Sequence, residues 1–431
     1  MDAATGLRAG AGEGSRGERA SGERERIASL DLVRGVAVLG ILAINISGFA
    51  GPIAATLSPN QPVLPGFAAT FADEAAWAAA LVVFEGKMRA LFTLLFGASL
   101  MLFIEAAEAR GLNGERLQFR RLGWLALAGY LHYLLLWWGD ILFTYAVAGL
   151  AALAFRQAPP RALAAAALVL FAGWHLTLAA ASLPDVAREE RVLAGHAAPG
   201  EAAAYSTDRD DDRAQAEREL ARDRSGFLAQ AAAKWRDDPG EPVSTALGGI
   251  GETLPLMLLG MALYGSGFFS GAWPRRRLKR LAWGGTVAGA AATLAFLARA
   301  WPRHFPPDLM LAALAYALAL PHLAMALGYA AALLLALPRL RPTRLGARLE
   351  AAGRMAFTNY IAMTVVMCAV FSGWGLGLIG RVPERWQPLF MLSGWVLMLG
   401  WSKPWLARFR YGPLEWLWRS ATFGQWQPLR R

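Results

Sequence analysis

Residues 26–45 read RIASLDLVRGVAVLGILAIN. The segment begins with basic residues and continues as an apolar run of the length that a membrane-spanning helix needs. Asp31, Arg34 and Asn45 lie on or in this helix, although polar and ionised groups are costly in hydrocarbon. Groups of this kind usually face the interior of a helix bundle or a water-filled cavity. The segment therefore predicts a membrane span that keeps one polar face for function.

Helix geometry places these three polar residues on one face. Asp31 and Arg34 are one turn apart. Asn45 follows Arg34 by 11 residues, a rotation of about 1100°, so it lies about 20° from the same face and about 16 Å further along the axis. In the simpler alternative, Asp31 and Arg34 only pair at the membrane interface, and Asn45 hydrogen-bonds to a neighbouring helix. Small residues predict that another helix approaches closely: Gly35, Ala37, Gly40 and Ala43.

The composition extends this interpretation to the whole chain. The 431 residues are 56% hydrophobic and 17% charged, whereas about a quarter of an ordinary soluble domain is charged. Apolar stretches recur, which predicts an all-α, polytopic membrane bundle and excludes a β-barrel, whose strands would alternate apolar and polar residues. We expect about ten spans, at 32–52, 87–105, 121–138, 140–156, 161–183, 246–266, 279–299, 308–337, 353–373 and 387–403.

Basic residues predict the orientation of these spans. With both termini in the cytoplasm, 28 of the 43 Lys and Arg residues fall on the cytoplasmic side, as the positive-inside rule requires. The same rule accounts for the net charge of +11, so no nucleic-acid partner is expected. The lipid bilayer is the expected partner, and the oligomeric state is left open, a homo-oligomer included.

The chain divides into four parts. Residues 1–29 are rich in Gly, Arg and Glu, which predicts a disordered cytoplasmic arm. Two five-span membrane halves, 30–182 and 246–431, flank a charged segment at 183–245. That segment predicts one or two solvated helices outside the cytoplasm, either as a surface cap or as part of a substrate site. The single cysteine, Cys368, excludes a disulfide framework and a thiolate metal site, and no metal is expected.

A second group of polar residues lies in RLGWLALAGYLHYLLLWWGDILFTY, residues 121–145. His132 is expected near the middle of the bilayer and could act as a general base, because imidazole titrates close to neutral pH. The alternative is a histidine that only shares a buried hydrogen bond with another helix. Asp140 could orient a substrate, or it could cap the following helix, since Gly-Asp before an apolar run is a helix start signal.

Two further stretches contribute candidates. Lys87 and Arg89 begin the second expected span in GKMRALFTLLFG, where two cations suit an anionic group or simply reach the membrane interface. In GRMAFTNYIAM, residues 353–363, Arg354 lies at a helix start and Asn359 lies inside the span.

Five stretches, in this order, resemble the YeiB family of bacterial inner-membrane proteins: RIASLDLVRGVAVLGILAIN, KMRALFTLLFG, LHYLLLWWGDILFTYAVAGL, GRMAFTNYI and RYGPLEWLWR. The resemblance covers most of the chain outside the N-terminal arm and the segment 183–245. It implies a multi-pass protein of the bacterial inner membrane. The family is similar, more distantly, to membrane-embedded acyltransferases such as heparan-glucosaminide N-acetyltransferase and enzymes that acylate bacterial surface glycans.

The match to these acyltransferases lies in the first span, where DLVRG resembles their Asp-x-x-Arg-Gly helix. In the glycan enzymes an Arg-x10-His pattern follows, with the histidine catalytic. Asn45 occupies that position here, as Asn does in the heparan enzyme, but no histidine lies between Asn45 and the second span. Arg121 and His132 repeat the Arg-x10-His spacing on the third span, and His132 lies inside a family-like stretch, so it is our candidate base.

The resemblance implies transfer of an acyl group from a cytosolic donor similar to acyl-CoA to an acceptor outside the cytoplasm, such as a glycan or lipid. The donor site would comprise Asp31, Arg34 and Arg121, with the phosphates bound by the arginines. Catalysis would involve Asn45 as an oxyanion donor, His132 as base and Asp140 to orient the acceptor.

The rival interpretation is a transporter or exporter of a small or lipidic solute, with the same polar groups along its path. A membrane scaffold without activity is a third. No phosphate loop, GxSxG elbow, HExxH or Rossmann glycine motif occurs, which argues against a self-contained ATP-driven pump.

Overall fold

The computed structural model describes residues 7–61 and 69–431, with side chains from Ser29 onward within those ranges. The described chain is helical and forms no β-strand, which confirms the all-α class. The helices are α1 Leu7–Ala50, α2 Ile53–Leu57, α3 Phe71–Val83, α4 Lys87–Glu108, α5 Gly114–Leu135, α6 Leu142–Leu153, α7 Pro160–Leu193, α8 Pro199–Asp223, α9 Phe227–Asp237, α10 Glu241–Gly265, α11 Arg275–Ala300, α12 Pro307–Ala312, α13 Ala319–Leu340, α14 Arg344–Arg354, α15 Ala356–Phe371, α16 Gln387–Arg408 and α17 Pro413–Phe423.

Six segments of the described chain are long and apolar enough to cross a membrane, or seven if α14 and α15, which meet at 86°, form one broken span. The six are Ser29–Ala50, Phe71–Glu108, Pro160–Leu193, Glu241–Gly265, Arg275–Arg303 and Ala319–Leu340. The chain is therefore a helical membrane protein. Other expected spans correspond to α5, α6 and α16, which are shorter or more polar, so the count of ten stays a prediction.

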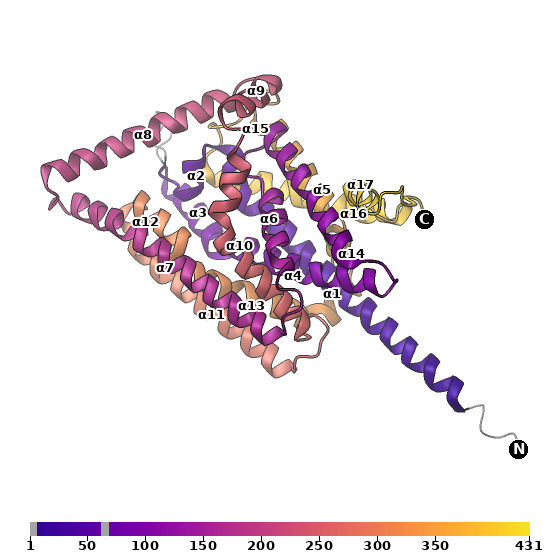
Figure 1. Ribbon diagram of the computed structural model, residues 1–431. Coiled ribbons are helices and arrows are strands. Elements are labelled where there is room, and N and C mark those ends of the chain that lie inside the picture. The colour runs from indigo at the N-terminus through magenta and orange to yellow at the C-terminus, as the bar shows by residue number, and fades with distance from the viewer. Residues whose placement is uncertain (1–6, 62–68) are drawn as a thin grey trace, which may run out of the picture.

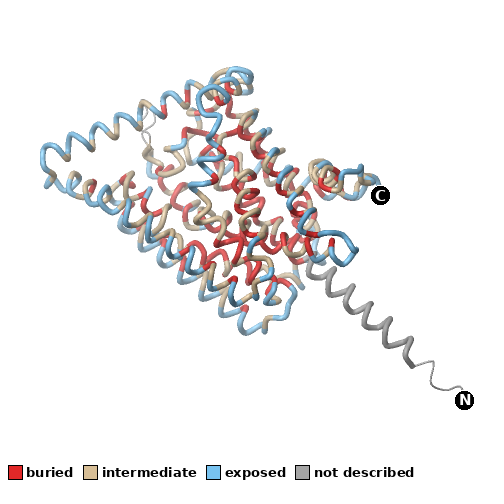
Figure 2. Tube along the Cα trace, viewed as in Figure 1, coloured by how far each residue is buried: buried red, intermediate tan, exposed pale blue. Residues whose placement is uncertain are grey.

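The bundle has a buried centre and an exposed side. α1, α4 and α10 run through the middle, α7, α11 and α13 cover one side, and α5, α16 and α17 lie on the other (Figure 1). Buried residues concentrate in the central helices, whereas α7 and α11 are largely exposed (Figure 2). We call the two ends of the bundle the α17 end, where α5 begins and α14 lies, and the α8 end, which α8 crosses.

A close helix crossing lies at the α17 end, between α1 and α14. A Cβ added to Gly35 would collide with the carbonyl of Leu349, and one added to Gly353 would collide with the carbonyl of Asp31. Glycine is required at both positions because the two backbones touch. This crossing fulfils the expectation that small residues on the first span allow close approach, and it fixes Asp31 and Arg34 against the break between α14 and α15.

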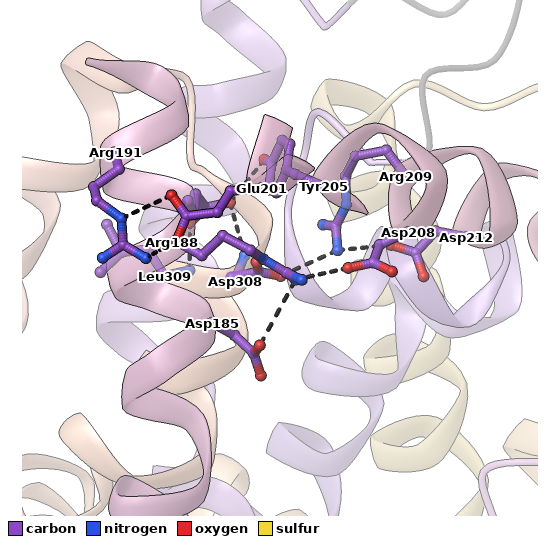
Figure 3. Close-up of polar contacts among 11 residues, drawn as sticks. Asp185, Arg188, Arg191, Glu201, Tyr205, Asp208, Arg209, Asp212, Asp308 and Leu309 are labelled. Atoms are coloured by element: carbon purple, nitrogen blue, oxygen red, sulfur yellow. Dashed lines mark hydrogen bonds and ion pairs between the residues drawn. The ribbon is translucent and has the colours of Figure 1, made fainter. Parts of the chain in front are cut away.

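At the α8 end, a network of ion pairs ties α7, α8 and α12 together (Figure 3). Glu189 accepts hydrogen bonds from the amides of Asp308 (3.0 Å) and Leu309 (2.8 Å) in the first turn of α12, and Tyr205 donates to the same carboxylate at 3.0 Å. Because orphan amides at a helix start need acceptors, Glu189 caps α12. We call this network the clasp; its members are Asp185, Arg188, Glu189, Glu190, Arg191, Glu201, Tyr205, Asp208, Arg209, Asp212, Arg299, Arg303 and Asp308.

Three segments differ from the sequence expectation. The backbone of α1 is helical from Leu7, where the composition predicts a disordered arm, and residues 1–6 lie outside the described residues. α7 continues to Leu193, ten residues past the expected span end, so part of the segment 183–245 is a continuation of a span. The expected span at 308–337 is interrupted by a π-helical turn at Ala313–Ala317.

Candidate functional site

A cavity of about 160 Å³ lies at the α17 end, and three arginines from three separate helices line it. Arg34 comes from α1, Arg121 from α5 and Arg354 from the end of α14. Each is partly accessible rather than buried. The structure therefore brings together two residues predicted to bind donor phosphates and a third candidate that the sequence could not place beside them.

Arg34 is held in a fixed position on the cavity wall. One guanidinium nitrogen donates to the carboxylate of Asp31 at 2.6 Å, and the other donates to the hydroxyl of Ser99 on α4 at 2.8 Å. The ion pair keeps Asp31 buried while 23% of the Arg34 side chain stays exposed. Asp31 thus positions the arginine, and part of the guanidinium remains available to a ligand.

Arg121 has a different environment. Its guanidinium lies over the ring of Trp418 (4.2 Å) and near that of Phe103 (4.7 Å). Its charged neighbours are Arg34 and Arg419. Among the described side chains it pairs with no carboxylate, and its side-chain hydrogen bond is a long one, 3.5 Å, to Gln118. Aromatic faces stabilise a cation only modestly, so the site carries an excess of positive charge.

The break between α14 and α15 forms another wall of the cavity. Glu415 of α17 accepts hydrogen bonds from the amides of Phe357 (2.8 Å) and Thr358 (3.0 Å), at the start of α15. The Thr358 hydroxyl donates to the same carboxylate at 2.5 Å. Glu415 therefore caps α15 from a distant part of the chain and holds α17 against the cavity.

His132 and Asp140 form a buried pair. Nδ1 of His132 lies 2.9 Å from Oδ1 of Asp140, and Nε2 lies 3.1 Å from the hydroxyl of Thr364 on α15. The other carboxylate oxygen of Asp140 accepts the amide hydrogen of Phe143 at 2.8 Å. Asp140 therefore caps α6, as one sequence alternative predicts, and it also contacts the imidazole; its orientation of a substrate stays a prediction. A carboxylate on Nδ1 favours the tautomer with a free lone pair on Nε2.

Tyr360 separates the histidine from the arginine cavity. Its ring centroid lies 5.1 Å from that of His132, and Tyr360 also lines the arginine cavity. On its other side is a void of about 10 Å³, whose walls include Asn45, Tyr360 and Thr364. The polar face of α1 therefore meets two adjacent spaces, with Arg34 at the first and Asn45 at the second.

Three other candidates lie elsewhere or serve the fold. Lys87 is fully buried and donates to the carbonyl of Leu81 at 2.5 Å, while Arg89 pairs with Glu252 on α10 at 3.4 Å. Neither lines the arginine cavity. Asn359 is fully buried, donates to the carbonyl of Ala352 (3.0 Å) and accepts from the indole of Trp401 (2.9 Å), which links α14, α15 and α16.

A cavity of about 330 Å³ lies at the α8 end, near the C-terminal end of α1 and the N-terminal end of α16. Glu384 is one of its wall residues and lies close to Ser47 and Gln387, which hydrogen-bond to each other at 3.0 Å. Burial raises the pKa of the Glu384 carboxyl to about 7. No sequence motif pointed to Glu384, because its environment is created by chain segments far apart.

Among the side chains that the structure describes, no group of three or more His, Cys, Asp or Glu residues is arranged to hold a metal ion. Arginine, histidine, tyrosine and amide groups dominate the site instead. This set suits recognition of an anion and movement of a proton.

The chain is similar to two proteins over nearly its whole length. It is 30% identical to the uncharacterized protein YxaH of Bacillus subtilis (strain 168), over 94% of this chain and 96% of that protein. It is also 30% identical to the uncharacterized protein YeiB of Escherichia coli (strain K12), over 92% of this chain and 96% of that protein. The chain belongs to the YeiB family. A family model described as a protein of unknown function (DUF418) matches residues 263–425, and no solved structure matches the chain.

The YeiB-family resemblance seen in the sequence is thus confirmed, and the stretches that carry it now have structural roles. RYGPLEWLWR supplies Glu415, which caps α15, and Trp418, which covers Arg121. Sequence reasoning did not single out these two residues, or Ser99, Tyr360 and Thr364. Apolar and hydroxyl side chains at helical spacing give no signal of their own, because their importance depends on which helices meet.

Proposed function

We propose that this YeiB-family chain is a multi-pass acyltransferase of the bacterial inner membrane. In this proposal ten spans cross the bilayer, both termini and the α17 end lie in the cytoplasm, and α8 and α9 lie outside it. The donor is a cytosolic acyl-CoA or a similar molecule, and the acceptor is a glycan or lipid. The observation that carries the proposal is the arginine cavity, which lies beside a buried histidine–carboxylate pair.

Donor binding is assigned to the three arginines. Guanidinium groups recognise phosphate oxygens through paired, charge-assisted hydrogen bonds. Arg34 and Arg121 present two such groups beside each other, and Asp31 fixes the first. A cavity of about 160 Å³ accepts a phosphate group of the donor, with the nucleotide at the cytoplasmic mouth and the thioester end directed into the bundle toward Asn45 and His132. Binding would offset the repulsion between the neighbouring guanidinium groups.

The chemistry is assigned to the buried pair. His132 would take a proton from the acceptor hydroxyl or amine through Nε2 while the acceptor atom forms a bond to the thioester carbonyl carbon. Asn45 would donate a hydrogen bond to the oxyanion, and cleavage of the carbon–sulfur bond would release a thiolate that the imidazolium protonates. Asp140 would stabilise the imidazolium. Thr364 would turn away from Nε2, since its hydroxyl has a second acceptor in the Tyr360 carbonyl at 3.1 Å.

The test uses the full chain in lipid nanodiscs with acetyl-CoA labelled in the acetyl group. We expect labelled acetyl-CoA to bind and the label to move to a lipid or added glycan. His132→Ala should remove transfer and keep binding, because the histidine is not among the residues that line the arginine cavity. The matched control is His175→Ala, which removes a histidine of α7 that hydrogen-bonds within its own helix, to the carbonyl of Phe171 at 2.7 Å.

The result separates the two function classes. Binding without transfer by the wild-type protein, together with uptake of an anionic solute into proteoliposomes, would support a transporter in place of an enzyme. Absence of binding, with the protein folded by circular dichroism, would overturn the donor assignment.

A further inference from the structure

An apolar groove of about 520 Å³ runs along the outside of α5 and is separate in position from the arginine cavity. α5 and α15 form its sides, α17 closes the end near the arginines, and Phe227 of α9 lies at the opposite end. The α5 wall includes Trp124 and Leu131, which are 44% and 43% exposed. Because these side chains face away from the bundle, the groove opens toward the bilayer.

The face of α5 that lines the groove changes from cationic to apolar along its length. Residues four apart lie one turn along a helix and about 40° around its axis. Trp124, Ala128, His132 and Leu136 line the groove. Arg120 precedes Trp124 by one turn, and Arg116 precedes it by two turns and about 80° of rotation. The apolar part from Trp124 to Leu136 is about 18 Å long at 1.5 Å per residue, which is close to the depth of one bilayer leaflet, about 15 Å. The groove thus has the length and the polarity of one lipid molecule.

The cationic end of this face has no built-in counter-charge. Arg120 donates to the carbonyl of Ala421, a wall residue of the groove, at 3.1 Å. Arg116 is exposed one turn earlier. Among the described side chains neither arginine pairs with a carboxylate. Trp418 lies in the wall between the groove and the arginine cavity, beneath the guanidinium of Arg121, so positive charge surrounds this end of the groove.

We propose that the groove binds an anionic glycerophospholipid of the cytoplasmic leaflet. Arg116 and Arg120 bind its phosphate, and one acyl chain lies along the apolar face of α5, over His132. Basic residues beside an apolar channel at the cytoplasmic side of a helix bundle are the arrangement that recognises acidic lipid headgroups. This site is distinct from donor binding and does not depend on acyl transfer.

The experiment is native mass spectrometry of the full chain in mild detergent, without any acyl donor. The probes are phosphatidylglycerol and phosphatidylcholine with identical acyl chains. We expect the wild-type protein to bind phosphatidylglycerol about thirtyfold more tightly, since two arginines each contribute about a fivefold gain near a charged lipid. Arg116→Gln with Arg120→Gln should remove this preference. The matched control, Arg276→Gln with Arg280→Gln, removes two exposed arginines at the same spacing on α11 and should keep it.

A second variant tests the chain-binding part. Ala128→Trp fills the groove and should weaken both phospholipids alike, whereas Ala172→Trp adds the same ring to an exposed position of α7 and should change neither. Equal binding of the two phospholipids by the wild-type protein would overturn the proposal, as would unchanged binding by a folded Ala128→Trp protein. Tighter binding of a polyprenyl phosphate than of phosphatidylglycerol would overturn the choice of a glycerophospholipid.

Discussion

The arginine cavity and the clasp are both built from charged side chains, but they balance charge differently. In the clasp each guanidinium has a carboxylate partner: Arg188 contacts Asp208 at 2.6 Å, and Arg303 contacts Glu190 at 2.5 Å. In the arginine cavity, Arg34 pairs with Asp31, but among the described side chains Arg121 has no carboxylate partner and contacts aromatic rings, a distant Gln118 and like-charged neighbours.

This difference in charge pairing distinguishes a network that stabilises the fold from a site suited to ligand binding. A network in which every guanidinium group has a carboxylate partner fastens helices together. A cluster with excess charge is unfavourable for the empty protein, because like charges repel, and it becomes favourable when an anion binds. We therefore interpret the clasp as a structural network and propose the cavity as a binding site. Four predictions test this distinction.

Gly353→Ala should have the largest effect. The added Cβ would collide with the carbonyl of Asp31, and backbone atoms cannot move aside as a side chain can. We expect the free energy of unfolding to fall by about 3 kcal/mol, the upper end for an overpacked site, and anion binding to be lost with it. Thermal unfolding in detergent measures this. Gly400→Ala on α16 has open space around the new Cβ and should be neutral or slightly stabilising.

Arg121→Gln should weaken binding without weakening the fold. We expect the Kd for coenzyme A, measured by calorimetry, to rise about thirtyfold, which corresponds to about 2 kcal/mol for one charge-assisted contact. The melting temperature should stay constant or rise, because a charge next to Arg34 is removed. A clear loss of stability in this variant would show that Arg121 belongs to a balanced network after all.

Arg303→Gln should have the opposite pattern. It removes the closest ion-pair partner of Glu190 and leaves Arg299, at 3.0 Å, as the remaining one. Since the network is partly exposed, we expect a loss of about 1 kcal/mol in unfolding free energy. Coenzyme A binding should be unchanged, and reduced binding would contradict a purely structural clasp.

Titration of Glu384 should have the smallest effect on the free energy of unfolding. This effect should depend on pH. Its pKa of about 7 in the folded protein lies above the ordinary value of 4.5, so the folded state holds the proton more tightly. The resulting stabilisation is complete below pH 4.5 and is lost as the pH rises through 7. We expect stability to fall by about 1 kcal/mol from pH 6 to 7 and the slope to flatten in Glu384→Gln. An identical slope in both proteins would assign the titration to another group.

Helical periodicity alone predicted many of the contacts made by the first span. One helical turn separates Asp31 and Arg34, and the structure pairs them at 2.6 Å. Glycine on the same helix predicted a close neighbour, although its identity, α14, depends on the order in which helices pack. The same limit applies to Arg121, whose distance from Arg34 is set by tertiary structure and not by the Arg-x10-His spacing.

The contact between His132 and Asp140 could not be predicted from the sequence. His132 and Asp140 were separate candidates because they are eight residues apart, and eight residues within one helix would place them about 12 Å apart along its axis. α5 instead ends at Leu135, and the turn that follows returns Asp140 to the imidazole. A chain reversal inside an apolar run has only a weak signal in the sequence. The contact could therefore be identified only from the structure.

The capping of α15 by Glu415 has a practical consequence for anyone who handles this protein. Removal of α17, or a reporter fused so closely that α17 is displaced, would leave the amides of Phe357 and Thr358 without their acceptor. The broken span would then lose the anchor that sets its angle. Affinity handles and fluorescent labels are therefore better attached through a long spacer, and deletion series should treat the C-terminal segment as part of the transmembrane assembly.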